Sequence, residues 1–114
     1  MRRICNGCKE LYEINAVELR RFGFRPTNEG QIVQIARGLG CEACRQTGYR
    51  GRIGLFELLV MNAVIANIIS KHGPDEAVLE AAKANRMKLL PEDGLVKIFE
   101  GITTPQEVLR VLRL

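Results

Sequence analysis

Two short cysteine pairs decide the fold: CNGC at residues 5–8 and CEAC at residues 41–44. They supply Cys5, Cys8, Cys41 and Cys44, which are all four cysteines of the chain. A C-x-x-C pair lets two thiolates converge on one point, and two such pairs offer the four sulfur ligands of a closed, structural Zn²⁺ site. The sequence therefore predicts a metal centre made by these four residues. Two disulfides, four free buried thiols and a four-thiolate iron site are the alternatives.

Length and composition indicate one domain, or one domain with a metal-tied lobe, in 114 residues. Hydrophobic residues make up 46% of the chain and charged residues 26%, as in ordinary soluble proteins. No apolar run approaches the roughly 20 residues that span a bilayer, and no signal-peptide pattern precedes Cys5. We therefore expect a cytoplasmic chain, and in that compartment reduced thiols favour zinc over disulfides.

The positive charge is confined to the first half of the sequence. Residues 1–60 hold ten Lys and Arg against six Asp and Glu, a net of +4, whereas residues 61–114 hold seven of each. Four thiolates with one Zn²⁺ would add −2 and bring the first half to +2. The high isoelectric point therefore overstates the basicity of the folded surface, which weakens a nucleic-acid interpretation based on charge alone.

Local patterns in the first half predict short elements around the cysteine pairs. Alternation suggests an extended segment at 11–14. Asn15 and Glu18 form a capping-box pattern before a helix at about 16–22, which Gly23 ends. Runs rich in β-branched and apolar residues predict strands at 31–37 and 52–60. Because these two strands flank one cysteine pair, we expect them to pair antiparallel as a metal-tied hairpin.

After Asn62 the apolar period changes from two to about 3.6 residues, which predicts helices. The expected helices run from Asn62 to about residue 72, from 75 to 86, from 91 to 99 and from 105 to 113. Thr104 and Glu107 form a second capping-box pattern, with Pro105 at the first helical position. The predicted fold class is α+β, with a tetracysteine zinc-tied β-hairpin lobe at 1–60 and a small helical bundle at 61–114.

The residues show no catalytic constellation. His72 is the single histidine, and its place near a helix end favours an exposed or capping role. With four thiols in one metal site no nucleophilic cysteine is left, and no G-x-x-x-x-G-K-[ST] phosphate loop occurs. Arg45, Arg50 and Arg52 gather around Tyr49. A solvated basic face is the simpler interpretation of them, and contact with an acidic partner, either a subunit or a nucleic acid, is the functional one.

Several blocks of the sequence resemble the C-terminal part of the type II secretion and type IV pilus assembly ATPases. The most specific is TGYRGRIGLFELL at residues 47–59, directly after the second cysteine pair. The others are RIC at 3–5, MKLL at 87–90, DG at 93–94, EGITT at 100–104 and EVLR at 107–110. The resemblance extends from residue 3 to about residue 111.

The resemblance implies a role within a larger motor. The family consists of cytoplasmic hexameric ATPases, peripheral to the inner membrane, that drive pilus or pseudopilus assembly through an inner-membrane platform protein. Its nucleotide-binding motifs lie upstream of the cysteine region, so ATP would bind only in the parent motor and this chain would not be an enzyme by itself. We expect a non-catalytic module with structural zinc that contacts the rest of the motor, neighbouring hexamer subunits and the platform protein. A free-standing zinc-ribbon protein that binds nucleic acid is the alternative.

Overall fold

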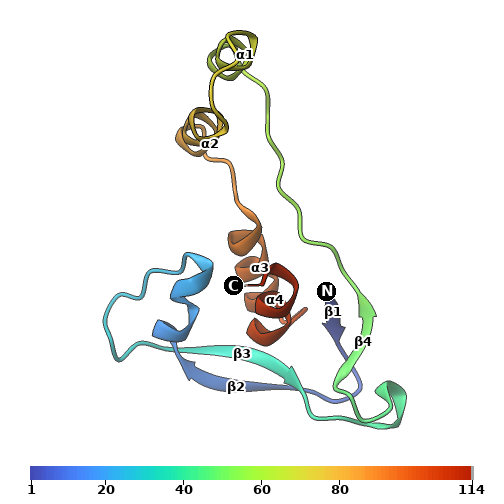
Figure 1. Cartoon of the computed structure of the whole chain (residues 1–114). Coiled ribbons are helices and arrows are strands. Elements are labelled where there is room, and N and C mark those ends of the chain that lie inside the picture. The colour runs from blue at the N-terminus through green and yellow to red at the C-terminus, as the bar shows by residue number, and fades with distance from the viewer. Residues whose placement is uncertain (114) are drawn as a thin grey trace. The chain divides into compact units, whose positions relative to one another are not determined.

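The computed structural model describes residues 1–113, so Leu114, the end of the expected helical region, lies outside the described residues. Its residues form two compact units, one made of residues 1–55 together with residue 90 onward, and one made of residues 56–89. The elements are β1 (Arg2–Ile4), β2 (Lys9–Asn15), the 3₁₀ helix η1 (Ala16–Phe22), β3 (Ile32–Gly38), the short 3₁₀ helix η2 (Glu42–Cys44), β4 (Tyr49–Arg52), α1 (Ala63–Ser70), α2 (Asp75–Ala84), α3 (Leu90–Phe99) and α4 (Pro105–Leu112) (Figure 1). Small antiparallel sheets with helices confirm the α+β class.

The first unit contains two separate two-stranded antiparallel sheets. In one, β2 pairs with β3 in a continuous register from Lys9 opposite Gly38 to Asn15 opposite Ile32. In the other, β1 pairs with β4, with Arg2 opposite Arg52 and a bulge before the next pair, Ile4 opposite Tyr49. The expected pairing of the segment at 31–37 with the segment at 52–60 is therefore wrong, because each segment pairs with an earlier strand, β2 for the first and β1 for the second.

The expected strand at 52–60 is also wrong beyond its first residue, since residues 53–60 have no regular secondary structure. The apolar run from Leu58 to Val60 resembles a buried strand in composition, but a strand also requires a partner for its backbone groups. Leu58 is instead 76% exposed and Val60 61% exposed. Composition alone does not reveal whether such a run will find that partner.

The core of the first unit is a cluster of buried apolar side chains from η1, β3, α3 and α4: Leu19, Phe22, Ile35, Ile98 and Val108. η1 starts at the predicted cap, where the Asn15 side chain accepts a hydrogen bond from the backbone N–H of Val17 at 3.0 Å. It ends as predicted at Gly23, in the left-handed region with φ of 89°. The buried face of η1 consists of Ala16, Leu19 and Phe22, which explains why apolar residues recur there every three positions in the sequence.

Helices α3 and α4 belong to this unit and pack closely on each other. The Thr104 side chain caps α4 by accepting a hydrogen bond from the backbone N–H of Glu107 at 3.2 Å, and Pro105 occupies the first turn, as predicted. Close approach is possible because α3 presents Gly94 to Val108. The expected division at residue 60 stays a prediction, because compactness alone does not show which segments fold independently.

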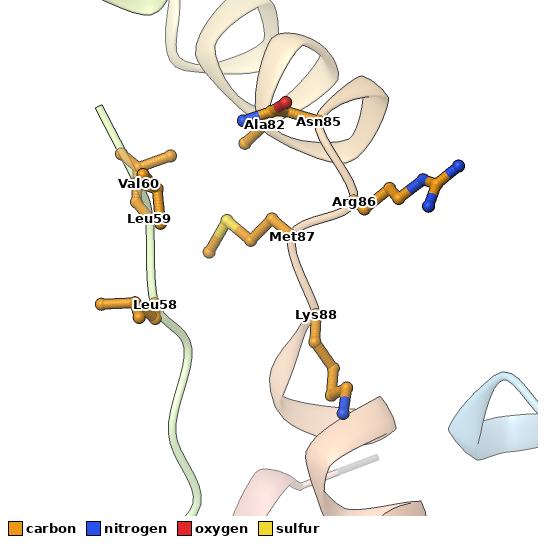
Figure 2. Close-up of a pocket in the computed structure, with 8 residues that line it drawn as sticks. All are labelled: Leu58, Leu59, Val60, Ala82, Asn85, Arg86, Met87 and Lys88. Carbon is orange, nitrogen blue, oxygen red and sulfur yellow. The ribbon is translucent and has the colours of Figure 1, made fainter. Parts of the chain in front are cut away.

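The second unit, residues 56–89, contains α1 and α2. α1 begins at the predicted cap, where the Asn62 side chain accepts a hydrogen bond from the backbone N–H of Ile65 at 2.9 Å. Figure 2 shows a pocket within this unit, in which Met87 points toward the extended segment that carries Leu58 and Leu59. In residues 1–113 the structure has no helix of the length and apolarity needed to cross a bilayer.

Candidate metal centre

The four cysteine sulfurs come together in one cluster, in which all four Sγ atoms lie within 4.8 Å of one another. The Sγ–Sγ distances are 3.7 Å for Cys5 and Cys41, 3.8 Å for Cys8 and Cys44, and 3.7 Å for Cys41 and Cys44. These distances are far longer than a disulfide bond of about 2.05 Å, and the thiols are free. Sulfurs about 2.3 Å from a tetrahedral Zn²⁺ would lie about 3.8 Å apart, so the cluster fits that ion.

Strand ends position both cysteine pairs. Cys5 directly follows β1 and Cys8 directly precedes β2, whereas Cys41 directly precedes η2 and Cys44 is its last residue, in the connection from β3 to β4. The backbone N–H of Cys5 donates to the carbonyl of Gly48 at 2.9 Å, which joins the two pairs through the main chain. One cysteine pair thus lies between β1 and β2 and the other between β3 and β4. A metal bound by both pairs would cross-link the two connections and so fix the two sheets to each other.

Backbone N–H groups point at the sulfurs. Gly40 donates to Cys8 Sγ at 3.2 Å, while Cys41 and Gly48 donate to Cys44 Sγ at 3.3 and 3.2 Å. Such hydrogen bonds favour the thiolate, which is the form that binds metals. The donor set and its surroundings thus suit a cation that is held by sulfur.

The pKa values of two thiols move in opposite directions. Burial opposes ionisation of Cys44, but the N–H groups of Cys41 and Gly48, with the neighbouring thiols, lower its pKa to about 6. Burial raises the pKa of Cys8 to about 11, against the effect of the Gly40 N–H and with that of the other thiols. A bound cation would supply positive charge that favours the thiolate form of its ligands.

Gly48 reaches Cys44 because its backbone can come very close to the backbone of Gly38. Gly48 adopts a φ of 81°, which favours glycine, and a Cβ on either residue would collide with the main chain of the other. The close approach to Gly38 therefore explains the glycine at position 48.

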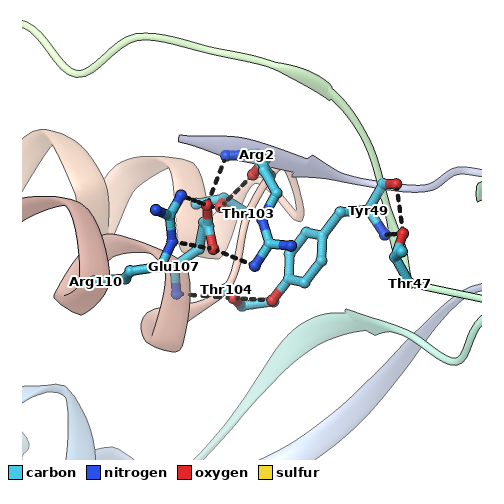
Figure 3. A network of polar contacts seen from close by, with 7 residues as sticks. All are labelled: Arg2, Thr47, Tyr49, Thr103, Thr104, Glu107 and Arg110. Carbon is cyan, nitrogen blue, oxygen red and sulfur yellow. Dashed lines mark hydrogen bonds and ion pairs between the residues drawn. The ribbon is translucent and has the colours of Figure 1, made fainter.

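A buried carboxylate that sequence reasoning missed lies in the same unit (Figure 3). Glu107 is 1% exposed and accepts hydrogen bonds from Arg2: from its backbone N–H at 3.0 Å, its Nε at 3.1 Å and its Nη2 at 2.9 Å. Arg110 donates to the same carboxylate. The hydrogen bonds from Arg110 and, against the effect of burial, those from Arg2 hold the pKa of Glu107 well below its usual range. The sequence offered only a capping role for Glu107.

The network continues from Arg2 to the residues after the metal-binding segment. The Arg2 guanidinium lies over the ring of Tyr49, with Cζ 4.2 Å from the ring centroid, and the Tyr49 hydroxyl lies 2.7 Å from the Thr104 hydroxyl. Thr103 donates to the carbonyl of Arg2 at 2.8 Å. Tyr49 is therefore a structural contact between β4 and the start of α4 (Figure 3).

Comparison with known proteins identifies the family. The family model described as "Type II/IV secretion system protein" matches residues 1–110. The chain belongs to the type II/IV secretion system protein family. The resemblance stated from the residue blocks at 3–5, 47–59 and 87–110 is thereby confirmed.

Curated relatives in this family include ATPases of both systems. The chain is 40% identical over 109 residues to the type IV pilus assembly ATPase PilB of Thermus thermophilus, covering 96% of the chain and 12% of the relative. It is 34% identical over 113 residues to the type II secretion system protein E of Pseudomonas aeruginosa and 31% identical over 113 residues to the type II secretion system ATPase E of Vibrio cholerae, covering 99% of the chain and 22% of each relative. The chain therefore spans between about an eighth and about a fifth of the length of these secretion and pilus proteins.

The remaining residues that the sequence singled out lie apart from the thiol cluster or on its surface. His72 is exposed in the second unit. Arg45, Arg50 and Arg52 are exposed in the first unit, with Arg45 in the left-handed region directly after η2. Within residues 1–113, the one group of three or more His, Cys, Asp or Glu residues with ligand atoms close enough to share a metal is the tetracysteine cluster.

Proposed function

We propose that this chain is the metal-tied, non-catalytic interaction module of a type II secretion or type IV pilus assembly ATPase. The observation that carries the proposal is the convergence of four thiols in a chain that aligns with 12% and 22% of the length of two relatives named as ATPases. In this role Cys5, Cys8, Cys41 and Cys44 hold a metal ion and the parent motor binds ATP elsewhere.

Zn²⁺ is the proposed ion. Four sulfur donors at tetrahedral spacing form a closed site with no open position for a water or substrate, which suits a structural ion and leaves nothing to react. The ion would supply cross-linking free energy to a small unit whose core contains few large side chains. A four-thiolate iron site uses the same ligands, but iron would colour the purified protein, whereas zinc would leave it colourless.

The proposed partners are the rest of the motor, the neighbouring subunits of a hexamer and an inner-membrane platform protein, with the module in the cytoplasm at the membrane face. The support is the family membership, together with the place of the four thiols between the ends of the strands, where a bound metal would cross-link them. A module fixed in this way can hold a contact surface at a constant angle while the motor changes conformation.

The test replaces Cys41 and Cys44 by Ser in the full-length motor, with Ala43→Ser as the control. Ala43 is exposed between the two ligands, so its substitution changes the same loop without removing a sulfur. We expect the double cysteine variant to lose bound zinc and to stop pilus or pseudopilus assembly, whereas the control keeps both. Normal assembly by a motor that has lost its metal would overturn the proposal.

A further inference from the structure

The β1–β4 sheet has one covered edge and one open edge. On the outer side of β1, the backbone N–H of Ile4 donates to the carbonyl of Ile102 at 2.8 Å, and Glu107 and Thr103 bond to the N–H and carbonyl of Arg2. In the described part of the chain β4 pairs with β1 alone. The open edge of this sheet is therefore β4, Tyr49–Arg52, except at Tyr49, whose N–H donates to Thr47 Oγ1 at 3.1 Å and whose carbonyl accepts from it at 2.9 Å.

The register shows which backbone groups face outward from β4. Met1 and Ile53 exchange two hydrogen bonds, each at 2.9 Å, and form a hydrogen-bonded pair. The next pair, Arg2 opposite Arg52, is then a non-hydrogen-bonded pair in an antiparallel ladder. The N–H and carbonyl of Arg52 consequently point away from β1, as the corresponding groups of Arg2 point away from β4.

This edge carries unbalanced positive charge. Arg2 lies directly opposite Arg52, an arrangement that repels, but Arg2 is paired with Glu107, a carboxylate that it shares with Arg110. None of the ion pairs within residues 1–113 involves Arg3, Arg50 or Arg52, which are all exposed. Arg50, Gly51 and Arg52 line a surface depression with Arg2 and Tyr49. The edge therefore offers the outward N–H and carbonyl of Arg52 next to the guanidinium groups of Arg50 and Arg52.

We propose that the β4 edge binds an extended acidic segment of a partner protein, which adds a third strand to the sheet beside Arg52 and places carboxylates against Arg50 and Arg52. Strand addition supplies backbone hydrogen bonds, and carboxylates match the guanidinium fork in two-pronged pairs. The inference deepens the interaction role proposed above, on which it rests, by naming the surface and the chemistry of its partner.

The surroundings of the edge favour a protein segment over a nucleic acid or a membrane. A nucleic acid would use aromatic rings for stacking, but Arg2 covers the Tyr49 ring and Thr104 holds its hydroxyl. Each basic residue contributes only about 1 kcal/mol to binding at an anionic membrane, so membrane-binding segments typically carry clusters of four to eight Lys and Arg residues. A short strand edge with arginines at two of its four positions suits a partner that also brings a backbone.

The experiment measures binding of a nine-residue peptide, blocked at both ends and with glutamate alternating with threonine, to the metal-loaded chain. Calorimetry gives Kd for the wild type, for Arg50→Gln/Arg52→Gln and for the control Arg20→Gln/Arg21→Gln, which removes the same charge from exposed residues of η1. We expect the β4 variant to bind at least about tenfold more weakly and the control to match the wild type.

A second measurement separates strand addition from charge attraction. The peptide should protect the amide N–H of Arg52 from hydrogen exchange, and the same peptide with methylated backbone nitrogens should not bind. No binding by the wild type, equal losses in both double variants, or equal binding of the methylated peptide would each overturn the proposal. Stronger binding of a nine-nucleotide single-stranded DNA or of phosphatidylglycerol vesicles would also overturn it. Because the peptide is tested on the isolated chain, these results are independent of the assembly assay for the cysteine variants.

Discussion

Glu107 in α4 accepts three hydrogen bonds from Arg2, 105 residues earlier in the chain, and so fastens the N-terminal strand β1 to the last helix. The carboxylate is buried, whereas the Arg2 side chain is 46% exposed. The pair is therefore asymmetric, because the carboxylate loses nearly all of its contact with water on folding whereas the guanidinium keeps about half. Its stability contribution depends on the donors around it.

Substitution of Glu107 by Gln should destabilise the fold by about 1–3 kcal/mol, since the amide keeps the side-chain shape but turns an N–H₂ group toward the guanidinium donors of Arg2 and Arg110. Urea unfolding of the metal-loaded protein measures the change. Glu29→Gln is the control, because Glu29 is exposed, and it should stay within about 0.5 kcal/mol of the wild type. Equal effects of the two substitutions would contradict the role assigned to Glu107.

The lowered pKa of Glu107 should make the stability of the protein depend on pH. The folded-state pKa of Glu107 lies below its ordinary value of 4.5, so the folded state binds the proton less tightly than the unfolded state. Its contribution is therefore fully present above about pH 4.5 and declines as the pH falls toward the lowered folded-state pKa. The free energy of unfolding of Glu107→Gln should differ from the wild type at pH 7 and approach it below pH 4.5. A difference that stays constant across this range would show that the carboxylate charge is not responsible.

Metal removal should lower stability, and loss of one sulfur should lower metal affinity. Loss of a residue that only supports a ligand typically costs 10–100-fold in metal affinity, so Cys44→Ser should cost more than about 100-fold. Metal analysis after dialysis against a competing chelator measures the change. The exposed neighbour Ala43→Ser is the matched control and should retain one metal per chain. Retention of metal by Cys44→Ser would remove Cys44 from the ligand set.

The parts of the fold that sequence predicted are those with local signals. Asn15, Asn62 and Thr104 each cap a helix at the predicted position, because a cap is formed by residues two or three apart. The convergence of the four cysteines followed from their spacing in pairs. In each case the residues that form the contact are close in sequence or of one distinctive type.

The parts that sequence missed depend on distant partners. β1 occupies only Arg2–Ile4 and has no pattern of its own, and it becomes a strand because β4 and the segment after α3 lie on either side of it. The burial of Glu107 likewise depends on Arg2. The prediction for Leu58 to Val60 was wrong in the opposite way, since their composition suggested a strand but they do not join a sheet in the structure. Long-range pairing decides these cases, and residue type carries little information about it.

Packing of α3 on α4 provides the last prediction. A Cβ added to Gly94 would lie 2.7 Å from Cγ1 of Val108 and 3.2 Å from its Cγ2, too close for an ordinary contact. Overpacking costs about 1–3 kcal/mol, whereas Ala gains about 1 kcal/mol over Gly inside a helix. Gly94→Ala should therefore destabilise the protein by up to about 2 kcal/mol. Gly30→Ala, where the added Cβ meets only a side-chain oxygen at 3.5 Å, is the control and should be nearly neutral.

A double-mutant cycle shows whether the clash with Val108 is the cause. Val108→Ala alone removes two buried methyl groups from the core and should also destabilise. In Gly94→Ala/Val108→Ala the new Cβ occupies space that those methyl groups have left, so the double variant should be more stable than the sum of the single changes predicts, by about 0.5–3 kcal/mol. Urea unfolding of all four proteins gives this coupling energy. Strict additivity would mean that the contact between the helices at Gly94 is not tight, and the loss in Gly94→Ala would then need another origin.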